Sequence, residues 1–144
     1  MDSLTVQQRS ERMALVRGKD TTPELQVRRL LWSLGYRYRL HGKDLPGRPD
    51  IVFRGRRRVI FVHGCMWHQH GCGAYKQPKS NVEFWAAKLG KNVERDQRHL
   101  QALVDAGWNV LVVWECELRH FQDLERRLVE FLERSPGAGE IASP

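Results

Sequence analysis

The sequence lacks long apolar runs, which argues against a membrane protein. No run approaches the roughly 20 apolar residues that a transmembrane helix needs, and residues 1–18 lack the apolar segment of a secretory signal. Cysteines are also few. Three of them make a poor disulfide framework but suitable metal ligands in a reducing compartment. We therefore expect a cytoplasmic protein that does not bind membranes.

Acidic residues are outnumbered by basic ones. The chain has 24 Lys and Arg against 17 Asp and Glu, which gives a formal net charge of +7. This excess predicts an acidic partner. Nucleic acid is the commonest such partner, because Lys and Arg that neutralise phosphates release condensed counterions. A basic surface that serves only solubility is the alternative.

Helix and strand signals alternate along the chain. A helix is marked by Thr22 as N-cap, Pro23 at its first position and Gly35 at its end. The other predicted elements are a basic helix over 5–16, a half-buried strand over 36–40, a hairpin of 50–53 with 58–62, helices over 81–89 and 92–106 separated at Gly90, a buried strand over 108–114 and a helix over 121–132.

This order of elements predicts an α/β fold, with a mixed central sheet flanked by helices. At 144 residues and without internal repeats, the chain is long enough for one domain and too short for two of ordinary size. We expect a single domain over residues 1–134 and a flexible Gly/Pro/Ser tail over 135–144.

Histidines and cysteines are concentrated in residues 61–72. Cys65, His70 and Cys72 form a C-x4-H-x-C cluster, which supplies three of the four ligands of a tetrahedral zinc site. Cys116 follows the predicted buried strand and would complete a Cys3His site. Such a closed site is structural, and it would tie a surface loop to the core. Unligated cysteines and surface imidazoles are the alternative.

Two carboxylates are candidates for a second, catalytic metal. Asp50 begins one hairpin strand and faces the end of the other, beside His63, so it could hold Mg²⁺ against a phosphate. An Asx-type turn after proline is the alternative for Asp50. Glu24, in the first turn of a helix, could reach the metal through water, or could simply be favoured there by the helix dipole.

His63 and His68 are left over once zinc has taken His70. One imidazole could accept a proton from the attacking water while the other contacts or protonates a phosphate oxygen. Both could instead be surface residues beside a metal loop.

Three large side chains are candidates for insertion into DNA. Met66 and Trp67 lie between the two histidines, and Trp85 lies downstream in a polar neighbourhood. Apolar side chains beside a basic surface can wedge between base steps. Plain core packing is the alternative, and it is the stronger one for Trp85.

Several blocks in order resemble the very short patch repair (Vsr) mismatch endonucleases, a branch of the restriction-endonuclease-like PD-(D/E)xK fold. The resemblance spans about residues 5–132. Its main blocks are R-G-K-D-T-x-P-E (17–24), L-P-G-R-P-D-I-V (45–52), F-V-H-G-C-M-W-H (61–68), F-W (84–85) and K-L-G-K-N-V-x-R-D (88–96).

The resemblance implies a strand-specific, Mg²⁺-dependent nick on the 5′ side of the T in a T:G mismatch that arises by deamination of 5-methylcytosine. It implies these site residues: Asp50 and the backbone carbonyl of Val62 as metal ligands, Glu24 as a water-mediated metal contact, His68 as general base, His63 as a phosphate contact or acid, Cys65, His70, Cys72 and Cys116 around zinc, and Met66, Trp67 and Trp85 as the wedge.

The resemblance also implies partners. These are double-stranded DNA with a T:G mismatch and further mismatch-repair proteins. The protein is expected to be a monomer that is associated with the nucleoid, and its basic N-terminal helix (1–18) is expected to clamp the DNA. Two positions depart from the family pattern. Val62 replaces a frequent threonine, and Met66 replaces a phenylalanine, which removes stacking worth roughly 1–3 kcal/mol. Two alternatives remain open: a nickase of the same fold with a broader target, and a non-catalytic zinc-containing DNA-binding module.

Overall fold

The computed structural model describes residues 21–65, 82–134, 139 and 141–142. The predicted basic helix over 5–16 therefore lies outside the described residues. In chain order the elements are α2 (Thr22–Ser33), β1 (Arg39–Leu40), β2 (Ile51–Phe53), β3 (Arg58–His63), α3 (Val82–Asp105), β4 (Asn109–Trp114), the 3-10 helix η1 (Glu115–Arg119), α4 (Phe121–Glu133) and β5 (Ile141–Ala142).

The strands form one mixed sheet in the order β1-β2-β3-β4-β5. The predicted hairpin is confirmed, because β2 and β3 pair antiparallel with Ile51 opposite Ile60. β4 lies parallel to β3 and is a buried interior strand between β3 and β5, as its apolar run indicates. β5 pairs with β4 and comes from the segment expected to be a tail.

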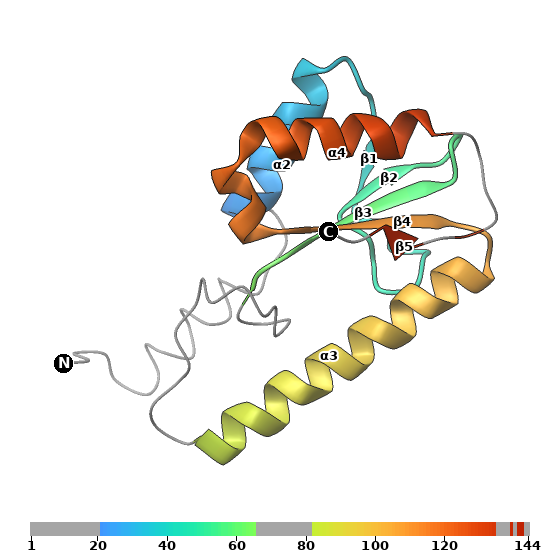
Figure 1. Ribbon diagram of the computed structural model, residues 1–144. Helices are drawn as coiled ribbons and strands as arrows, with labels where there is room; N and C mark the ends of the chain where they lie inside the picture. The colour runs from blue at the N-terminus through green and yellow to red at the C-terminus, as the bar shows by residue number, and fades with distance from the viewer. Residues whose placement is uncertain (1–20, 66–81, 135–138, 140, 143–144) are drawn as a thin grey trace.

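Helices cover both faces of this sheet (Figure 1). Alternate residues of β3 point to opposite faces, as the two-residue period of a strand requires. Ile60 packs into a core with buried residues of α2 and α4, whereas Val59 and Phe61 pack into a second core with Leu103 of α3. The mixed α/β architecture predicted from the sequence is therefore confirmed.

The prediction of two helices separated at Gly90 is wrong, because the single helix α3 runs through this glycine. Glycine inside a helix costs roughly 1 kcal/mol relative to alanine. Leu89 and Leu103 on the same helix are 2% and 0% exposed. Burying a leucine side chain contributes roughly 1.5–3 kcal/mol, so tertiary packing outweighs the local penalty.

Two smaller differences concern element ends. The N-cap of α2 is Thr21, whose hydroxyl accepts a hydrogen bond from the Glu24 amide at 3.4 Å, so the cap lies one residue before the predicted one. The strand predicted over 36–40 is limited to its last two residues, because the Tyr36 amide donates to the Leu31 carbonyl at 3.1 Å. None of the helices in the described part of the chain is long and apolar enough to cross a membrane.

Candidate active site

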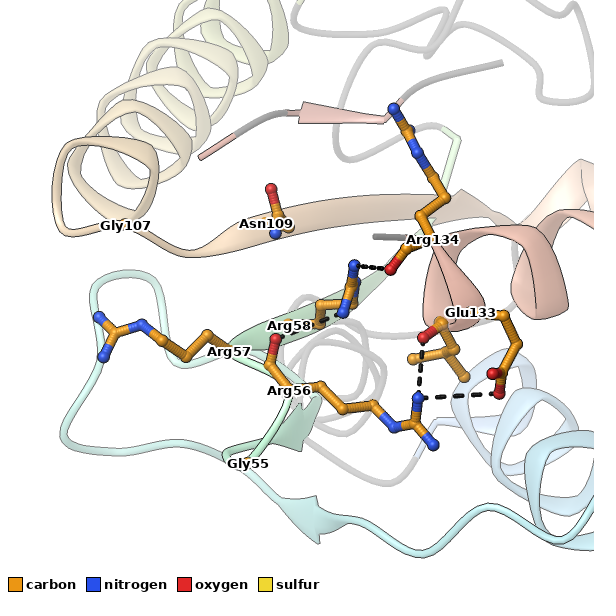
Figure 2. A pocket seen from close by; sticks show the side chains of 9 residues that line it. Gly55, Arg56, Arg57, Arg58, Gly107, Asn109, Glu133 and Arg134 are labelled. Atoms are coloured by element: carbon orange, nitrogen blue, oxygen red, sulfur yellow. Dashed lines mark hydrogen bonds and ion pairs between the residues drawn. The ribbon is translucent and has the colours of Figure 1, made fainter. Parts of the chain in front are cut away.

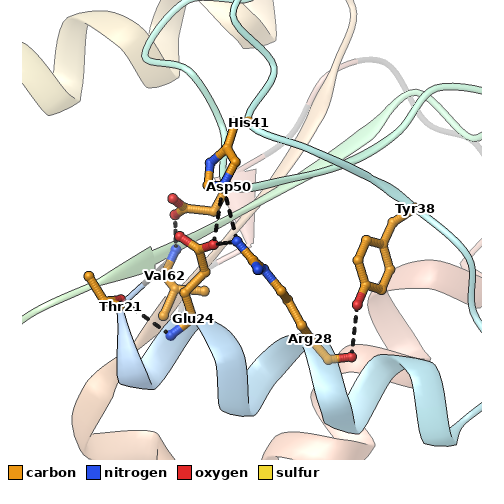
Figure 3. A network of polar contacts seen from close by, with 7 residues as sticks. All are labelled: Thr21, Glu24, Arg28, Tyr38, His41, Asp50 and Val62. Carbon is orange, nitrogen blue, oxygen red and sulfur yellow. Dashed lines mark hydrogen bonds and ion pairs between the residues drawn. The ribbon is translucent and has the colours of Figure 1, made fainter. Parts of the chain in front are cut away.

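The first turn of α2 and the start of β2 bring Glu24 and Asp50 together at one end of the sheet (Figure 3). Asp50 immediately precedes β2, and its Oδ2 accepts a hydrogen bond from the backbone amide of Val62 at 2.7 Å. This bond connects the start of β2 to the end of β3. The predicted position of Asp50, beside the end of its hairpin partner, is confirmed.

Glu24 is only 2% exposed and shares its surroundings with two basic side chains. Arg28, one turn further along α2, forms an ion pair with the Glu24 carboxylate. Nε2 of His41 lies 3.6 Å from Glu24 Oε2 and 3.0 Å from Nη2 of Arg28. Burying a carboxylate without such partners would cost several kcal/mol, so the three side chains are interdependent.

The burial of Asp50 dominates the electrostatics of the site. Burial and, to a smaller extent, the neighbouring Glu24 carboxylate raise the pKa of Asp50 to about 8, while the Val62 amide and Arg28 act in the opposite direction. A raised pKa means that the ionised form of Asp50 is disfavoured in the protein alone. A bound cation would remove this penalty, because it stabilises both carboxylates as anions.

The donor atoms at this position fit a divalent cation. Glu24, His41 and Asp50 each offer one ligand atom, and these atoms lie within 4.8 Å of one another. Carboxylate oxygens suit Mg²⁺, which usually keeps part of its water shell, and an imidazole nitrogen also suits transition metals such as Mn²⁺. The cluster has the composition of a site for a metal that binds phosphate.

His41 is a member of the cluster that the sequence interpretation did not identify. Its backbone amide donates to the Asp50 carbonyl at 3.0 Å, which extends the pairing of Leu40 with Ile51 by one residue. His41 also has a positive φ of 52°, an uncommon conformation for a residue other than glycine. Only the register of β1 against β2 reveals that His41 lies beside Asp50. This register depends on the tertiary structure and could not be predicted from the sequence.

The ring of His63 lies among aromatic side chains. His63 is 7% exposed, and its ring centroid is 5.5 Å from that of Phe61 and 5.3 Å from that of Trp114. It directly follows Val62, whose amide binds Asp50. The backbone therefore places His63 next to the carboxylate cluster, and flanking rings hold its imidazole.

Two of the four predicted zinc ligands lie at the same end of neighbouring strands. His63 and Trp114 are paired in the parallel β3–β4 ladder, and Cys65 and Cys116 each follow two residues later. The Cys65 amide also donates to Oε1 of Glu115 at 2.9 Å. Cys65 is fully buried and Cys116 is partly buried. The sheet thus places Cys65 and Cys116 at the same end, as binding of both residues to one metal ion would require.

Trp85 lies near the start of α3, in the part of this helix that extends beyond the sheet (Figure 1). Its ring is half-buried and lies 5.6 Å from the ring of Phe84, which is 59% exposed. The Lys88 ammonium lies 5.4 Å from the centre of the Trp85 ring. The three side chains form an aromatic and basic surface. Phe84 is its most exposed member, and the sequence interpretation did not assign it a role.

The remaining predicted site residues are His68, His70, Cys72, Met66 and Trp67. They lie outside the described residues, so the roles assigned to them stay predictions.

Comparisons with known proteins agree with the motif resemblance. The family model described as DNA mismatch endonuclease Vsr matches residues 1–74. The type II nicking enzyme V.XorIIP of Xanthomonas oryzae is 53% identical over 134 residues, which cover 93% of this chain and 98% of the relative. The DNA mismatch endonuclease Vsr of Escherichia coli is 46% identical over 126 residues, which cover 87% of this chain and 81% of the relative.

A mixed α/β sheet that holds two neighbouring carboxylates at one end, in a basic chain with such relatives, defines a metal-dependent DNA endonuclease. Within that class, the chain belongs to the Vsr family of DNA mismatch endonucleases. Its substrate is therefore DNA, and its reaction is hydrolysis of a phosphodiester bond.

Proposed function

We propose that the protein nicks one strand of duplex DNA on the 5′ side of the T in a T:G mismatch, in a Mg²⁺-dependent reaction. The observation that carries the chemical part of this proposal is the pair of neighbouring carboxylates, Glu24 and Asp50, in which burial and then the charge of Glu24 raise the pKa of Asp50. Action at mismatches is supported by family membership and by the name of the E. coli relative, a DNA mismatch endonuclease. The preference for T:G is what the motif resemblance implies.

Asp50 is proposed as the direct metal ligand. The amide of Val62 holds one oxygen of this carboxylate, and the N–H and C=O of a residue in a strand point to the same side. The Val62 carbonyl would therefore lie on the side of Asp50 and could be a second ligand. A bound Mg²⁺ would polarise the phosphate and lower the pKa of a bound water. The backbone role explains why valine is acceptable at position 62.

Glu24 and His41 would act around the metal. Glu24 is held by Arg28, so it is positioned to accept hydrogen bonds from metal-bound water. His41 faces the same cluster and would be a water contact with Mg²⁺ or a direct ligand for Mn²⁺. Arg28 pairs with the buried Glu24 carboxylate and orients it.

His63 and His68 are proposed to handle the phosphate and the proton. The imidazole of His63 is oriented by Phe61 and Trp114 beside the residue that binds Asp50, which suits contact with a phosphate oxygen. We assign the general base to His68, because its near-neutral pKa as an imidazole allows it to accept a proton from water.

Zinc would hold the segment that carries these residues. We propose Cys65, His70, Cys72 and Cys116 as its ligands, and the common end of β3 and β4 supports the inclusion of Cys65 and Cys116. Closing this site would anchor the segment between Cys65 and Cys72 at both ends. Anchoring would restrict the motion of His68. Such restriction is needed because a general base must be placed to within a fraction of an ångström.

Met66, Trp67 and Trp85 are proposed to insert beside the mismatch. The exposed surface of Phe84, Trp85 and Lys88 supports this assignment for Trp85, since aromatic rings stack on bases and lysine contacts phosphates. Inserting side chains must repay a few kcal/mol of unstacking. A mismatched pair is easier to open than a matched one, so the wedge also favours the proposed substrate.

An oligonucleotide panel tests the proposal. Duplexes that carry T:G, other mismatches or no mismatch are incubated with the protein in Mg²⁺ or in chelator, and nicks are mapped on both strands. We expect a nick only 5′ of the mismatched T and only with Mg²⁺. The variants Asp50→Ala and His68→Ala should lose at least 100-fold in rate, whereas His120→Ala, at an exposed position after η1, should retain activity.

Each competing interpretation predicts a different result. Equal nicking of matched duplexes would identify a broader nickase of the same fold. Mismatch binding without any nick would identify a non-catalytic DNA-binding module. Unchanged nicking by Asp50→Ala would show that the catalytic assignment is wrong.

A further inference from the structure

A group of arginines lies at the start of β3, whereas the end of this strand adjoins the carboxylate cluster. Figure 2 shows the side chains around these arginines. The turn between β2 and β3, the start of β4 and the end of α4 surround a cavity of about 350 Å³. Three consecutive arginines, Arg56, Arg57 and Arg58, contribute to its wall. Arg58 and His63 are the two ends of β3, so about 17 Å separates this cavity from the end of the strand beside Asp50.

Neutral groups hold the three guanidinium groups in place. Arg56 donates to the Leu132 carbonyl at 2.9 Å, Arg57 to the Ala106 carbonyl at 2.9 Å and Arg58 to the Arg134 carbonyl at 2.6 Å. These carbonyls belong to the ends of α3 and α4, so each arginine caps a helix. Capping uses one or two of the five N–H donors of a guanidinium and leaves the others available.

Each guanidinium also lies over an aromatic ring. The distances to the ring centres are 5.5 Å for Arg56 over Tyr36, 5.3 Å for Arg57 over Trp108 and 5.8 Å for Arg58 over Phe131. Stacking restricts a side chain that would otherwise lose about 2 kcal/mol of rotamer entropy when it binds a ligand. The arginines are therefore oriented in advance.

The positive charge around the cavity is only partly balanced. Glu133 lies 3.7 Å from Arg56, and both side chains are about half exposed, so solvent weakens this ion pair. Among the described residues, no carboxylate lies within ion-pair distance of Arg57 or Arg58. Two helix C-termini add about −0.5 each. In the part of the chain that the structure describes, Arg56, Arg57 and Arg58 set against Glu133 and the two helix ends leave roughly one positive charge, and Arg134, which also lines the cavity, is not included in this count.

Arg58 is the most buried of the three arginines. It is 4% exposed, and burial lowers its pKa, with Arg56 and Arg134 lowering it further. A buried guanidinium crowded by other guanidinium groups is stabilised by an anion with several acceptor oxygens, because arginine binds phosphate in a bidentate manner.

We propose that this cavity is a second anion site and takes a phosphate group. Free phosphate, a small phosphomonoester and a phosphate of the DNA backbone share this chemistry. The site is separate from the candidate active site, and its ligand would not take part in strand cleavage.

Calorimetric titration of the purified full chain with inorganic phosphate in about 0.15 M NaCl tests the proposal. The variants are Arg57→Gln and Arg56→Gln, which remove exposed guanidinium groups and leave Arg58 and its buried environment intact. Arg54→Gln is the matched control, because Arg54 is in the same turn, is 51% exposed and pairs with Asp44 outside the cavity. A parallel arm measures anisotropy with a matched DNA duplex.

We expect Arg57→Gln to raise the dissociation constant for phosphate at least tenfold. Arg54→Gln should leave this constant within twofold of the parent. Loss of affinity for the duplex alone, again in Arg57→Gln and not in Arg54→Gln, would identify DNA as the source of the phosphate group. The proposal is overturned if Arg57→Gln and Arg54→Gln behave alike in both arms.

Discussion

Replacing Asp50 with asparagine should stabilise the metal-free protein at the pH where the enzyme works, even though it abolishes cleavage. Asparagine keeps the shape of the side chain, and its oxygen can still accept the hydrogen bond from the Val62 amide at the position where Asp50 accepts it at 2.7 Å. It removes the charge whose burial beside Glu24 raises the pKa of Asp50 from 3.8 to about 8.

The sign of the pH dependence follows from proton binding. The folded protein holds the Asp50 proton more tightly than the unfolded chain, so this residue makes the free energy of unfolding fall as pH rises from about 4 to about 8. One pKa unit corresponds to 1.36 kcal/mol, so the shift of the Asp50 pKa from 3.8 to about 8 sets an upper limit of about 6 kcal/mol. Relaxation and water entry reduce such penalties, and we expect a difference of about 2–4 kcal/mol at pH 8.

Urea unfolding in chelator measures this difference. Asp50→Asn should exceed the parent in stability at pH 8 and approach it at pH 4.5. Adding Mg²⁺ should stabilise the parent much more than Asp50→Asn, because the Asp50 carboxylate is the proposed direct ligand and the amide that replaces it carries no charge.

Asp44→Asn is the matched control. Asp44 is exposed, and its hydrogen bond with Arg54 lowers its pKa, so its contribution to stability has the opposite sign. A parent and an Asp50→Asn variant with the same pH dependence would refute the electrostatic description of the site.

Three further predictions concern the metals and the DNA surface. His41→Ala should weaken Mn²⁺ binding about tenfold in calorimetry and Mg²⁺ binding less, because imidazole prefers transition metals; equal losses for both ions would exclude a ligand role. Cys116→Ser should reduce bound zinc, expected at about one per chain in the parent, when the metal is measured after dialysis; unchanged zinc would remove Cys116 from the site. Trp85→Ala should weaken mismatch binding by about 1–3 kcal/mol in anisotropy titrations, while Lys88→Ala mainly reduces the salt dependence; a Trp85→Ala variant with parental affinity would assign Trp85 to packing.

Local signals were sufficient for much of the fold and for family membership. The hairpin that joins Asp50 to Val62 could be predicted because a basic turn separates two short apolar segments. α4 could be predicted because its apolar residues recur at helical spacing and are buried together. Motif blocks in a fixed order identified the family, which the comparisons then confirmed.

Other features could not be predicted because they depend on contacts between distant segments. Gly90 was interpreted as a helix end from its local propensity, but burial on either side of it keeps α3 continuous. His41 enters the carboxylate cluster only through the register of β1 against β2. The cavity of Arg56, Arg57 and Arg58 likewise requires the ends of α3 and α4 to meet the hairpin turn.

The sequence by itself determined which residue types are present for chemistry and where most of the helices and strands lie, since both follow from side-chain identity and short-range periodicity. Only the tertiary structure decided which of those residues become neighbours. The physical reason is that a carboxylate acquires a raised pKa from burial and from the charge of another segment, as Asp50 does from Glu24.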